Sequence, residues 1–128
     1  MKKIWINGCF DVLHYGHFSL IAYAKTLGHL RIGIDSDERV KTSKGNTRPF
    51  HNADQRIFNL MNIEGVNDIV VFDNDKELAS LIKEYQPDIF VIGDDYKNKT
   101  IIGKKYAKEI IYFPRVEGFS TTKILENE

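Results

Sequence analysis

The stretch KKIWINGCFDVLHYGHFSLIAYAKTLG, residues 2–28, contains one complete unit of strand, loop and helix. KKIWIN is short, apolar and rich in β-forming residues, and it ends at Gly8, which predicts a buried first strand. From His17 onward apolar residues recur with the spacing of one helical face, and Gly28 follows as a typical C-terminal stop. GCFDVLHYGH is therefore expected to form a glycine-punctuated loop between the strand and the helix.

The alternation of strand and helix continues along the chain. Further strands are expected at residues 30–35, 68–72, 89–93 and 110–113, and helices at about 53–63, at 78–85, through 104–109 and from Ser120. Near-continuous apolar strands between helices predict an α/β fold, a single Rossmann-like domain over residues 1–128 with a five-stranded parallel sheet and helices on both faces. Ligands of such sheets bind beyond the carboxyl ends of the strands. The one long irregular stretch, residues 42–52, is expected to be a functional or mobile loop.

The charge balance and the cysteine content limit the partners and the compartment. The chain has 128 residues, and its 18 basic and 18 acidic side chains cancel. No overall field would attract it to nucleic acid or to an anionic membrane, so we expect neither as a partner. No apolar stretch approaches the ~20 residues that span a bilayer. Because the single Cys9 cannot form an internal disulfide and the first residues lack the features of a secretory leader, we expect a cytoplasmic protein.

The clearest candidate for chemistry is HYGH, residues 14–17, where the first loop gives way to the helix. Two imidazoles three residues apart can face one way there, beside free backbone N–H groups that favour an anion. Such donors would stabilise charge on a transferring phosphoryl group, and Gly16 would let a phosphate approach the backbone. Taken alone, the motif is equally compatible with one histidine that caps the helix and another that packs. A zinc site that includes Cys9 or Asp11 is a weaker alternative.

Two further groups of residues follow later strands. Arg115 and the hydroxyls of residues 120–122 would form a second anion-binding site after the last strand, although Ser120 is also an ordinary N-cap. Asp94, directly after the fourth strand, could contact a base edge or a hydrated Mg²⁺, and the alternative is a simple turn-forming aspartate.

A third group of basic residues lies in and after the long irregular stretch. Lys44, Arg48 and Arg56 could close over a polyphosphate and neutralise developing charge. A solvated basic loop is the commoner role of such residues.

GCFDVLHYGH (residues 8–17), GDDY (93–96) and RVEGFSTTKI (115–124) together resemble the cytidylyltransferase-like nucleotidyltransferases, and the resemblance covers nearly the whole chain. Within that superfamily the chain looks like the glycerol-3-phosphate cytidylyltransferases and like the adenylyltransferase domain of ADP-heptose synthases, both of which make activated precursors for cell-surface polymers. The resemblance implies that His14 and His17 stabilise the pentavalent α-phosphate and that Lys44 and Arg115 complete the catalytic set.

The same resemblance implies which residues contact the substrates. We assign the nucleotide to Gly8, Cys9, Phe10, Asp11, Gly16, Asp94, Arg115, Gly118, Ser120 and Thr121. The acceptor is assigned to Arg48 and Arg56. Val116 stands where the family usually has threonine, which removes one hydroxyl and leaves one phosphate or base contact open.

These residues predict an enzyme that joins a nucleoside triphosphate to a small phosphorylated acceptor and releases pyrophosphate, with Mg²⁺ accompanying the triphosphate. The resemblance of Arg115 and of Asp94 and Asp95 to the cytidylyltransferases implies CMP transfer from CTP to glycerol 3-phosphate, which we favour slightly. ATP-dependent adenylyl transfer to heptose 1-phosphate, which GCFD and KGNTRP resemble, is the alternative.

Two other functional classes stay open at this point. One is a dinucleotide-binding oxidoreductase, because Asp35 ends the second strand where a ribose-binding acid often lies, although the first loop lacks GxGxxG. The other is a regulatory module that binds a nucleotide without turnover. A homodimer is expected because symmetric dimers are the commonest oligomers.

Overall fold

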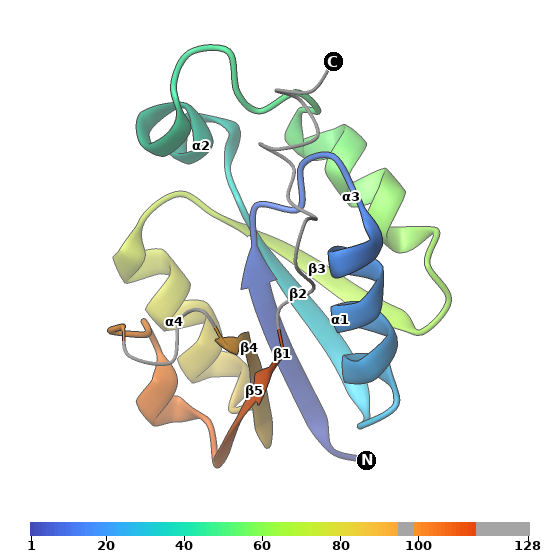
Figure 1. The fold of residues 1–128 in the computed structure, drawn as a ribbon. Coiled ribbons are helices and arrows are strands. Elements are labelled where there is room, and N and C mark those ends of the chain that lie inside the picture. Colours follow the sequence, from blue (N-terminus) through green and yellow to red (C-terminus); the bar gives the residue numbers. More distant parts are fainter. Residues whose placement is uncertain (95–98, 115–128) are drawn as a thin grey trace.

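The computed structural model describes residues 1–94 and 99–114, whose five strands pair in parallel in one sheet (Figure 1). The strands are β1 (Lys3–Gly8), β2 (His29–Asp35), β3 (Val66–Phe72), β4 (Ile89–Gly93) and β5 (Glu109–Phe113). Each expected strand is present, and the expectation of an α/β fold built on a five-stranded parallel sheet is confirmed.

The strand order is β3-β2-β1-β4-β5, so the chain extends the sheet first to one side of β1 and then to the other. From β1 the chain adds β2 and β3 on one side, and then β4 and β5 on the other side, so the direction in which strands are added reverses between β1 and β4. Connections that leave the carboxyl ends of two such neighbours depart to opposite sides and leave a crevice where ligands bind. The topology therefore places the ligand site beyond Gly8 and Gly93, at the ends of β1 and β4.

Helices cover both faces of the sheet (Figure 1). α1 (Tyr15–Lys25) and α3 (Ala53–Met61) pack on one face, and α4 (Asp75–Tyr85) and the 3-10 turn η2 (Lys104–Tyr106) pack on the other. α2 (Asp37–Lys44) lies beyond the carboxyl ends of the strands. None of the helices in the described part of the chain combines the length and the apolar character that a membrane crossing requires.

The pairing register decides which side chains share a face. Successive side chains of a strand point to opposite faces, and paired residues of parallel strands point to the same one. Trp5 pairs with Phe90, and both belong to the apolar core between the sheet and α4. Asp35 pairs with Phe72 of the same core, and Asn7 lies two residues after Trp5. Asn7 and Asp35 therefore lie at the carboxyl edge on the face that α4 covers.

Three helix expectations differ from the structure. The irregular stretch predicted over residues 42–52 is shorter, because α2 continues to Lys44 and leaves only residues 45–52 without regular structure. The helix predicted through 104–109 is only the short turn η2, which starts after Gly103 in the left-handed region (φ 78°). α3 ends at Met61, two residues earlier than predicted. The helix expected from Ser120 lies outside the described residues.

The sequence analysis misses α2 because this helix has no apolar face. Val40 is its only buried residue, so it lacks the periodic apolar signal of a surface helix. It is stabilised instead at its ends. The Ser36 side chain accepts a hydrogen bond from the N–H of Arg39 at 3.1 Å, acidic residues occupy the first turn, and lysines occupy the last.

Candidate active site

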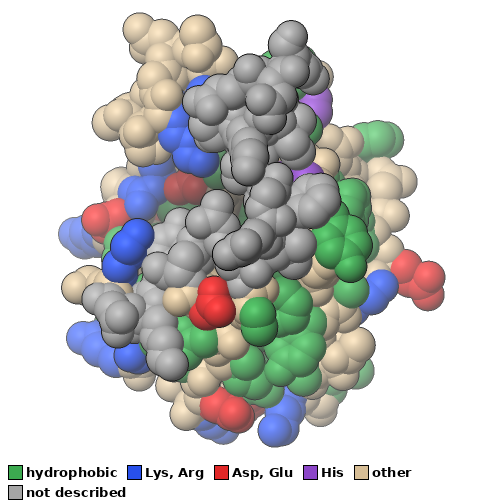
Figure 2. Space-filling view, in the orientation of Figure 1, with side chains coloured by type: hydrophobic (Ala, Val, Ile, Leu, Met, Phe, Trp, Pro, Cys, Tyr) green, Lys and Arg blue, Asp and Glu red, His purple; other side chains and the backbone are tan. Residues whose placement is uncertain are grey.

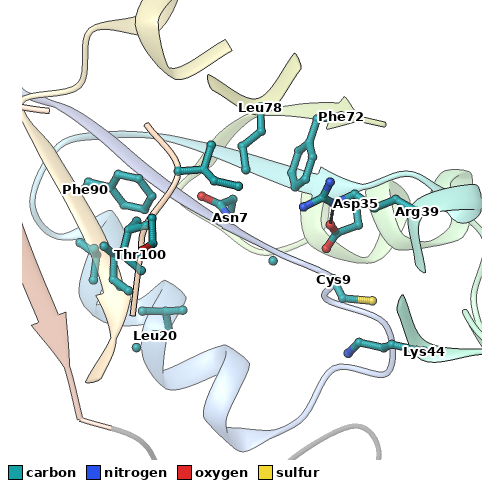
Figure 3. Close-up of a pocket in the computed structure, with 16 residues that line it drawn as sticks. Asn7, Cys9, Leu20, Asp35, Arg39, Lys44, Phe72, Leu78, Phe90 and Thr100 are labelled. Carbon is teal, nitrogen blue, oxygen red and sulfur yellow. Dashed lines mark hydrogen bonds and ion pairs between the residues drawn. The ribbon is translucent and has the colours of Figure 1, made fainter. Parts of the chain in front are cut away.

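A cavity of about 290 Å³ opens at the carboxyl edge of the sheet, where β1, β2, β3 and β4 end (Figure 3). Its polar lining includes Asn7, Cys9, Asp35, Arg39, Lys44 and Thr100, and its apolar lining includes Phe72, Leu78, Phe90 and Ile92. A concave, largely apolar pocket with a few polar groups at a topological switch point is the usual form of a small-molecule site.

His14 and His17 cap the start of α1. His14 is the N-cap residue, and its Nδ1 accepts a hydrogen bond from the N–H of Gly16 at 3.1 Å. In return, Nδ1 of His17 accepts from the N–H of His14 at 3.3 Å. The pair forms a reciprocal capping box, and the ring centroids lie 3.9 Å apart. Figure 2 shows histidine side chains beside the N-terminal ends of α1 and α3. The capping role left open by the sequence is therefore correct, and it applies to both rings.

The capping hydrogen bonds also decide which ring nitrogen can donate. A neutral imidazole carries its proton on one nitrogen, and Nδ1 accepts in both rings, so the proton lies on Nε2. Burial lowers the pKa of His14. Burial, with the neighbouring His14 and Lys44, lowers the pKa of His17 to about 3. At neutral pH the site therefore presents two neutral Nε2–H donors next to each other.

Lys44, the last residue of α2, lies at the edge of the cavity beside Cys9 (Figure 3). Its charge acts on His17 as well as on Cys9. Burial raises the pKa of the Cys9 thiol, and the charges of Lys44 and Arg56 offset only part of that rise. Cys9 is thus a protonated thiol at neutral pH, while Lys44 supplies a positive charge close to the histidine pair.

Phe10 and Gly8 position the ring of His17. Phe10 has a left-handed backbone (φ 50°) and a buried ring whose centroid lies 5.2 Å from that of His17. A Cβ atom at Gly8 would come within 3.2 Å of the Phe10 ring. A side chain at the end of this strand would therefore have to shift the Phe10 ring by a few tenths of an ångström.

Asp11 connects the first loop to the segment before α3. Its carboxylate is 1% exposed and accepts hydrogen bonds from the N–H groups of Phe50 and His51, both at 2.7 Å, and from Nε of Arg48 at 3.1 Å. Burial would raise the pKa of Asp11, but the donors of His51, Phe50 and Arg48 together hold it below its usual value. Asp11 is therefore an ionised structural anchor.

Arg56 connects three segments of the site. Its side chain is fully buried, and Nη1 donates to the carbonyl oxygens of Cys9 at 3.0 Å and Asp35 at 2.7 Å. Nε donates to the carbonyl oxygen of His51 at 3.1 Å, and Nη2 forms an ion pair with Asp37 at 2.8 Å. One guanidinium thus holds the loop after β1, the start of α2 and the segment before α3 in fixed relative positions.

The structure brings the histidine pair, Lys44 and the first loop together, as the sequence predicts. It places the other predicted residues differently. The Arg48 and Arg56 side chains are buried against protein groups, and the Gly16 N–H is bound by His14, so their predicted ligand contacts stay predictions. Asp94 is exposed directly after β4. The remaining predicted residues, Arg115, Gly118, Ser120 and Thr121, lie outside the described part of the chain.

The cavity also contains residues to which the sequence analysis assigns no role in it, among them Asn7, Arg39 and Thr100. Asn7 could be found from the sequence, because it is the polar residue that interrupts an apolar strand just before Gly8. Arg39 could not, since its helix is not predicted there. Thr100 follows β4 by seven residues, and no local pattern places it near β1.

The described residues contain no group of three or more His, Cys, Asp or Glu side chains that could hold a metal ion. The zinc alternative loses its support there, because the Asp11 carboxylate binds protein donors and both Nδ1 atoms of the histidine pair accept backbone hydrogens. Mg²⁺ requires few protein ligands, since it keeps several waters and binds substrate phosphates. An ion that arrives with a triphosphate is compatible with these residues, and Mg²⁺ stays a proposal.

Arg56→Lys should lower the free energy of unfolding by about 2–4 kcal/mol, because an ammonium cannot reach the groups that the guanidinium fork satisfies and leaves buried carbonyl oxygens without donors. Arg31→Lys is the matched control: Arg31 forms a partly exposed ion pair with Asp68 and stacks on the Tyr85 ring, both of which a lysine can partly retain, so the loss should be about 1 kcal/mol or less. Urea-induced unfolding measures both. Equal losses in the two variants would contradict the role of Arg56.

His17→Gln should remove part of the pH dependence of stability. Below pH 6.5 the unfolded chain binds a proton at His17, whereas the folded protein, with a pKa of about 3, does not. The free energy of unfolding therefore falls as the pH decreases through this window, by about 1.5 kcal/mol between pH 6.5 and 5 from this side chain. Glutamine is a usual residue at this position of a capping box, so the helix start is preserved.

The measurement is urea unfolding of the wild type and of His17→Gln at pH 6.5 and 5. His14 and Asp11 are present in both proteins, so the difference between the two pH dependences isolates His17. Parallel pH curves for the two proteins would show that the His17 pKa is not lowered.

Comparison with known proteins identifies close relatives. The chain is 42% identical to the bifunctional protein HldE of Helicobacter hepaticus and 44% identical to that of Helicobacter pylori strain HPAG1, in each case over 98% of this chain. The matched part is 26% and 27% of those proteins, so the chain spans about a quarter of the length of these relatives.

Solved structures share the fold at lower identity. The lipopolysaccharide core biosynthesis protein from Thermoplasma volcanium matches with a TM-score of 0.65 and 21% identity over 94% of this chain and 99% of that one. Pantothenate synthetase from Thermus thermophilus matches with a TM-score of 0.63 and 12% identity over 91% of this chain and 56% of that one.

A family model described as cytidylyltransferase-like matches residues 5–127, almost the whole chain. The match extends from the first strand through the capping histidines and Lys44 to the last strand, and it displaces the oxidoreductase alternative. The chain belongs to the cytidylyltransferase-like family, and it is a nucleotidyltransferase.

Proposed function

We propose that the chain transfers AMP from ATP to a heptose 1-phosphate and releases pyrophosphate. The observation that carries the reaction class is the pair of Nε2–H donors of His14 and His17, placed side by side at the start of α1 and next to Lys44. The alternative raised by the sequence is thus preferred to its first choice, CMP transfer to glycerol 3-phosphate.

Two observations support ATP and a heptose as substrates. The segments GCFD and KGNTRP resemble heptose adenylyltransferases, and the relatives with 42–44% identity over 98% of this chain are HldE proteins. The features that favour cytidylyl transfer are fewer. They are Asp94, which is exposed and does not line the cavity among the described residues, and Arg115, which lies outside them.

The mechanism needs no covalent intermediate on the enzyme. An oxygen of the acceptor phosphate attacks the α-phosphorus of ATP in line, the bond between the α-phosphorus and the bridging oxygen breaks, and pyrophosphate leaves on the opposite side. Charge on the equatorial oxygens of the α-phosphate is stabilised by the neutral Nε2–H groups of His14 and His17 and by the Lys44 ammonium. Catalysis then consists of positioning and charge stabilisation.

The surroundings of the site are suited to polyphosphate. Figure 2 shows Lys and Arg side chains interspersed with Asp and Glu on the α2 and α4 side of the carboxyl edge. Lys44 and Arg39 line the cavity there. Because the total charge of the chain is zero, the Lys44 ammonium at the cavity rather than an overall field would attract the triphosphate. Mg²⁺ bound to ATP and a homodimeric assembly remain parts of the proposal.

The direct test is pyrophosphate release by the wild type with Mg²⁺. ATP and CTP are each combined with heptose 1-phosphate and with glycerol 3-phosphate. We expect turnover with ATP and heptose 1-phosphate. Preferred turnover with CTP and glycerol 3-phosphate would overturn the proposal, and nucleotide binding without turnover of any pair would favour the regulatory module.

His14→Asn should separate catalysis from capping. Asparagine is among the best N-cap residues, so α1 should start normally, but the Nε2–H donor is lost. Turnover should fall about 10²–10³-fold, the usual cost of one oxyanion donor. Asn74→Ser, an N-cap exchange at α4 in a residue that does not line the cavity, is the control. Thermal unfolding of both variants checks the fold, and near-normal turnover of a folded His14→Asn would exclude a catalytic role for His14.

A further inference from the structure

The cavity at the carboxyl edge has a wall that the phosphate chemistry does not use. Asn7, Asp35, Phe72 and Phe90 line it from the face of the sheet that α4 covers. The histidine pair starts α1, which packs on the opposite face. The edge of the sheet thus divides the ligand site into two parts. One part contains His14 and His17 and is assigned to phosphate by the proposed function, and the other part needs a different ligand group.

Asn7 is held in one orientation. Its Oδ1 accepts a hydrogen bond from Nε1 of Trp5 at 2.9 Å, and Trp5 is fully buried. The indole lies so close to β2 that a Cβ atom at Gly33 would come within 2.6 Å of it, so the ring has no room to turn. With Oδ1 occupied, the amide of Asn7 is left with its two N–H donors, and Figure 3 shows its side chain at the cavity.

Asp35 is also held in place, by Arg39. Nε of Arg39 donates to Oδ1 of Asp35 at 2.7 Å, while its Nη2 forms an ion pair with Asp75 at 2.8 Å and its guanidinium lies 5.2 Å from the centre of the Phe72 ring. The Asp35 side chain keeps 21% of its surface exposed. Within residues 1–94 and 99–114 the other carboxylate oxygen, Oδ2, makes no hydrogen bond.

The wall therefore combines a fixed carboxylate acceptor, a fixed amide donor and the apolar side chains Phe72 and Phe90. Neighbouring hydroxyl groups on a carbon ring can donate to a carboxylate and accept from an amide, while the C–H surface of the ring packs on apolar side chains. Glycerol 3-phosphate is too short to offer such a ring. The complementary ligand is a polyhydroxylated sugar.

We propose that Asp35, with Asn7, determines specificity for the acceptor by binding neighbouring hydroxyls of its sugar ring. This inference rests on the proposed function. Lys44 lies in the same cavity and beside the histidine pair, so a sugar in this position would have its phosphate next to the α-phosphate of ATP. The ribose of ATP also carries two neighbouring hydroxyls. The test below therefore distinguishes binding of the acceptor sugar from binding of this ribose.

The test is the steady-state kinetics of Asp35→Asn, an exchange that keeps the shape and the oxygen that Arg39 binds. The KM for heptose 1-phosphate should rise about 10- to 100-fold, the range expected when a hydrogen bond to a charged group is weakened, while the KM for ATP stays within about twofold. The preference for heptose 1-phosphate over glycerol 3-phosphate, expressed as a ratio of kcat/KM, should fall by the same factor. Glu38→Gln, which removes an exposed carboxylate from the same region, should leave all three values unchanged.

The other outcomes of the kinetics and of a binding measurement can be told apart. If the wild type turns over heptose 1-phosphate and Asp35→Asn keeps its selectivity, the proposed function stands and Asp35 has no role in it. If only the KM for ATP rises, the wall binds ribose. If the wild type is inactive, binding of heptose 1-phosphate to both proteins is measured by calorimetry instead. Binding that Asp35→Asn loses supports the sugar site even if the proposed reaction fails, and no binding to the wild type excludes it.

Discussion

The carboxyl edge of the sheet depends on one buried guanidinium. Parallel strands end in carbonyl groups and loops that the sheet itself does not satisfy, and here the ends of β1 and β2 and the segment before α3 converge on Arg56. A single side chain that donates to Cys9, Asp35 and His51 replaces several separate loop contacts. Asp11 adds the complementary part, because its buried carboxylate accepts from the backbone of the segment before α3. The loops at this edge are therefore positioned by buried interactions between protein groups.

The two faces of the sheet explain how a small α/β chain can handle two substrates. Side chains alternate between the faces, so adjacent strand ends deliver different chemistry to each side of one edge. The α1 side receives imidazole donors from a helix start, and the α4 side receives Asn7 and Asp35 from β1 and β2. Lys44 is close to both sides, because α2 lies beyond the edge rather than on either face.

The strands and the position of the site could be predicted from the sequence, because buried parallel strands are continuous apolar segments and their order limits where ligands bind. The histidine pair was singled out because it lies where a loop gives way to a helix, and Lys44 was singled out by the family resemblance rather than by its position in α2. α2 could not be predicted, because its stability comes from capping and charge rather than from an apolar face. The structural roles of Arg48 and Arg56 were also invisible, since a buried and a solvated arginine look alike when their partners are distant carbonyl and carboxylate groups.

The reciprocal capping of His14 and His17 has a consequence for the energetics of binding. Immobilising a flexible side chain on association costs about 0.5–1.5 kcal/mol, and catalytic donors on mobile side chains carry that cost with every substrate. Here both rings are oriented by backbone hydrogens of the helix that they start. Their order is established once, when the chain folds, and is present in every ligand-free molecule. In the proposed reaction the site is preorganised, so the Nε2–H dipoles would not need to rotate into place to meet the developing charge.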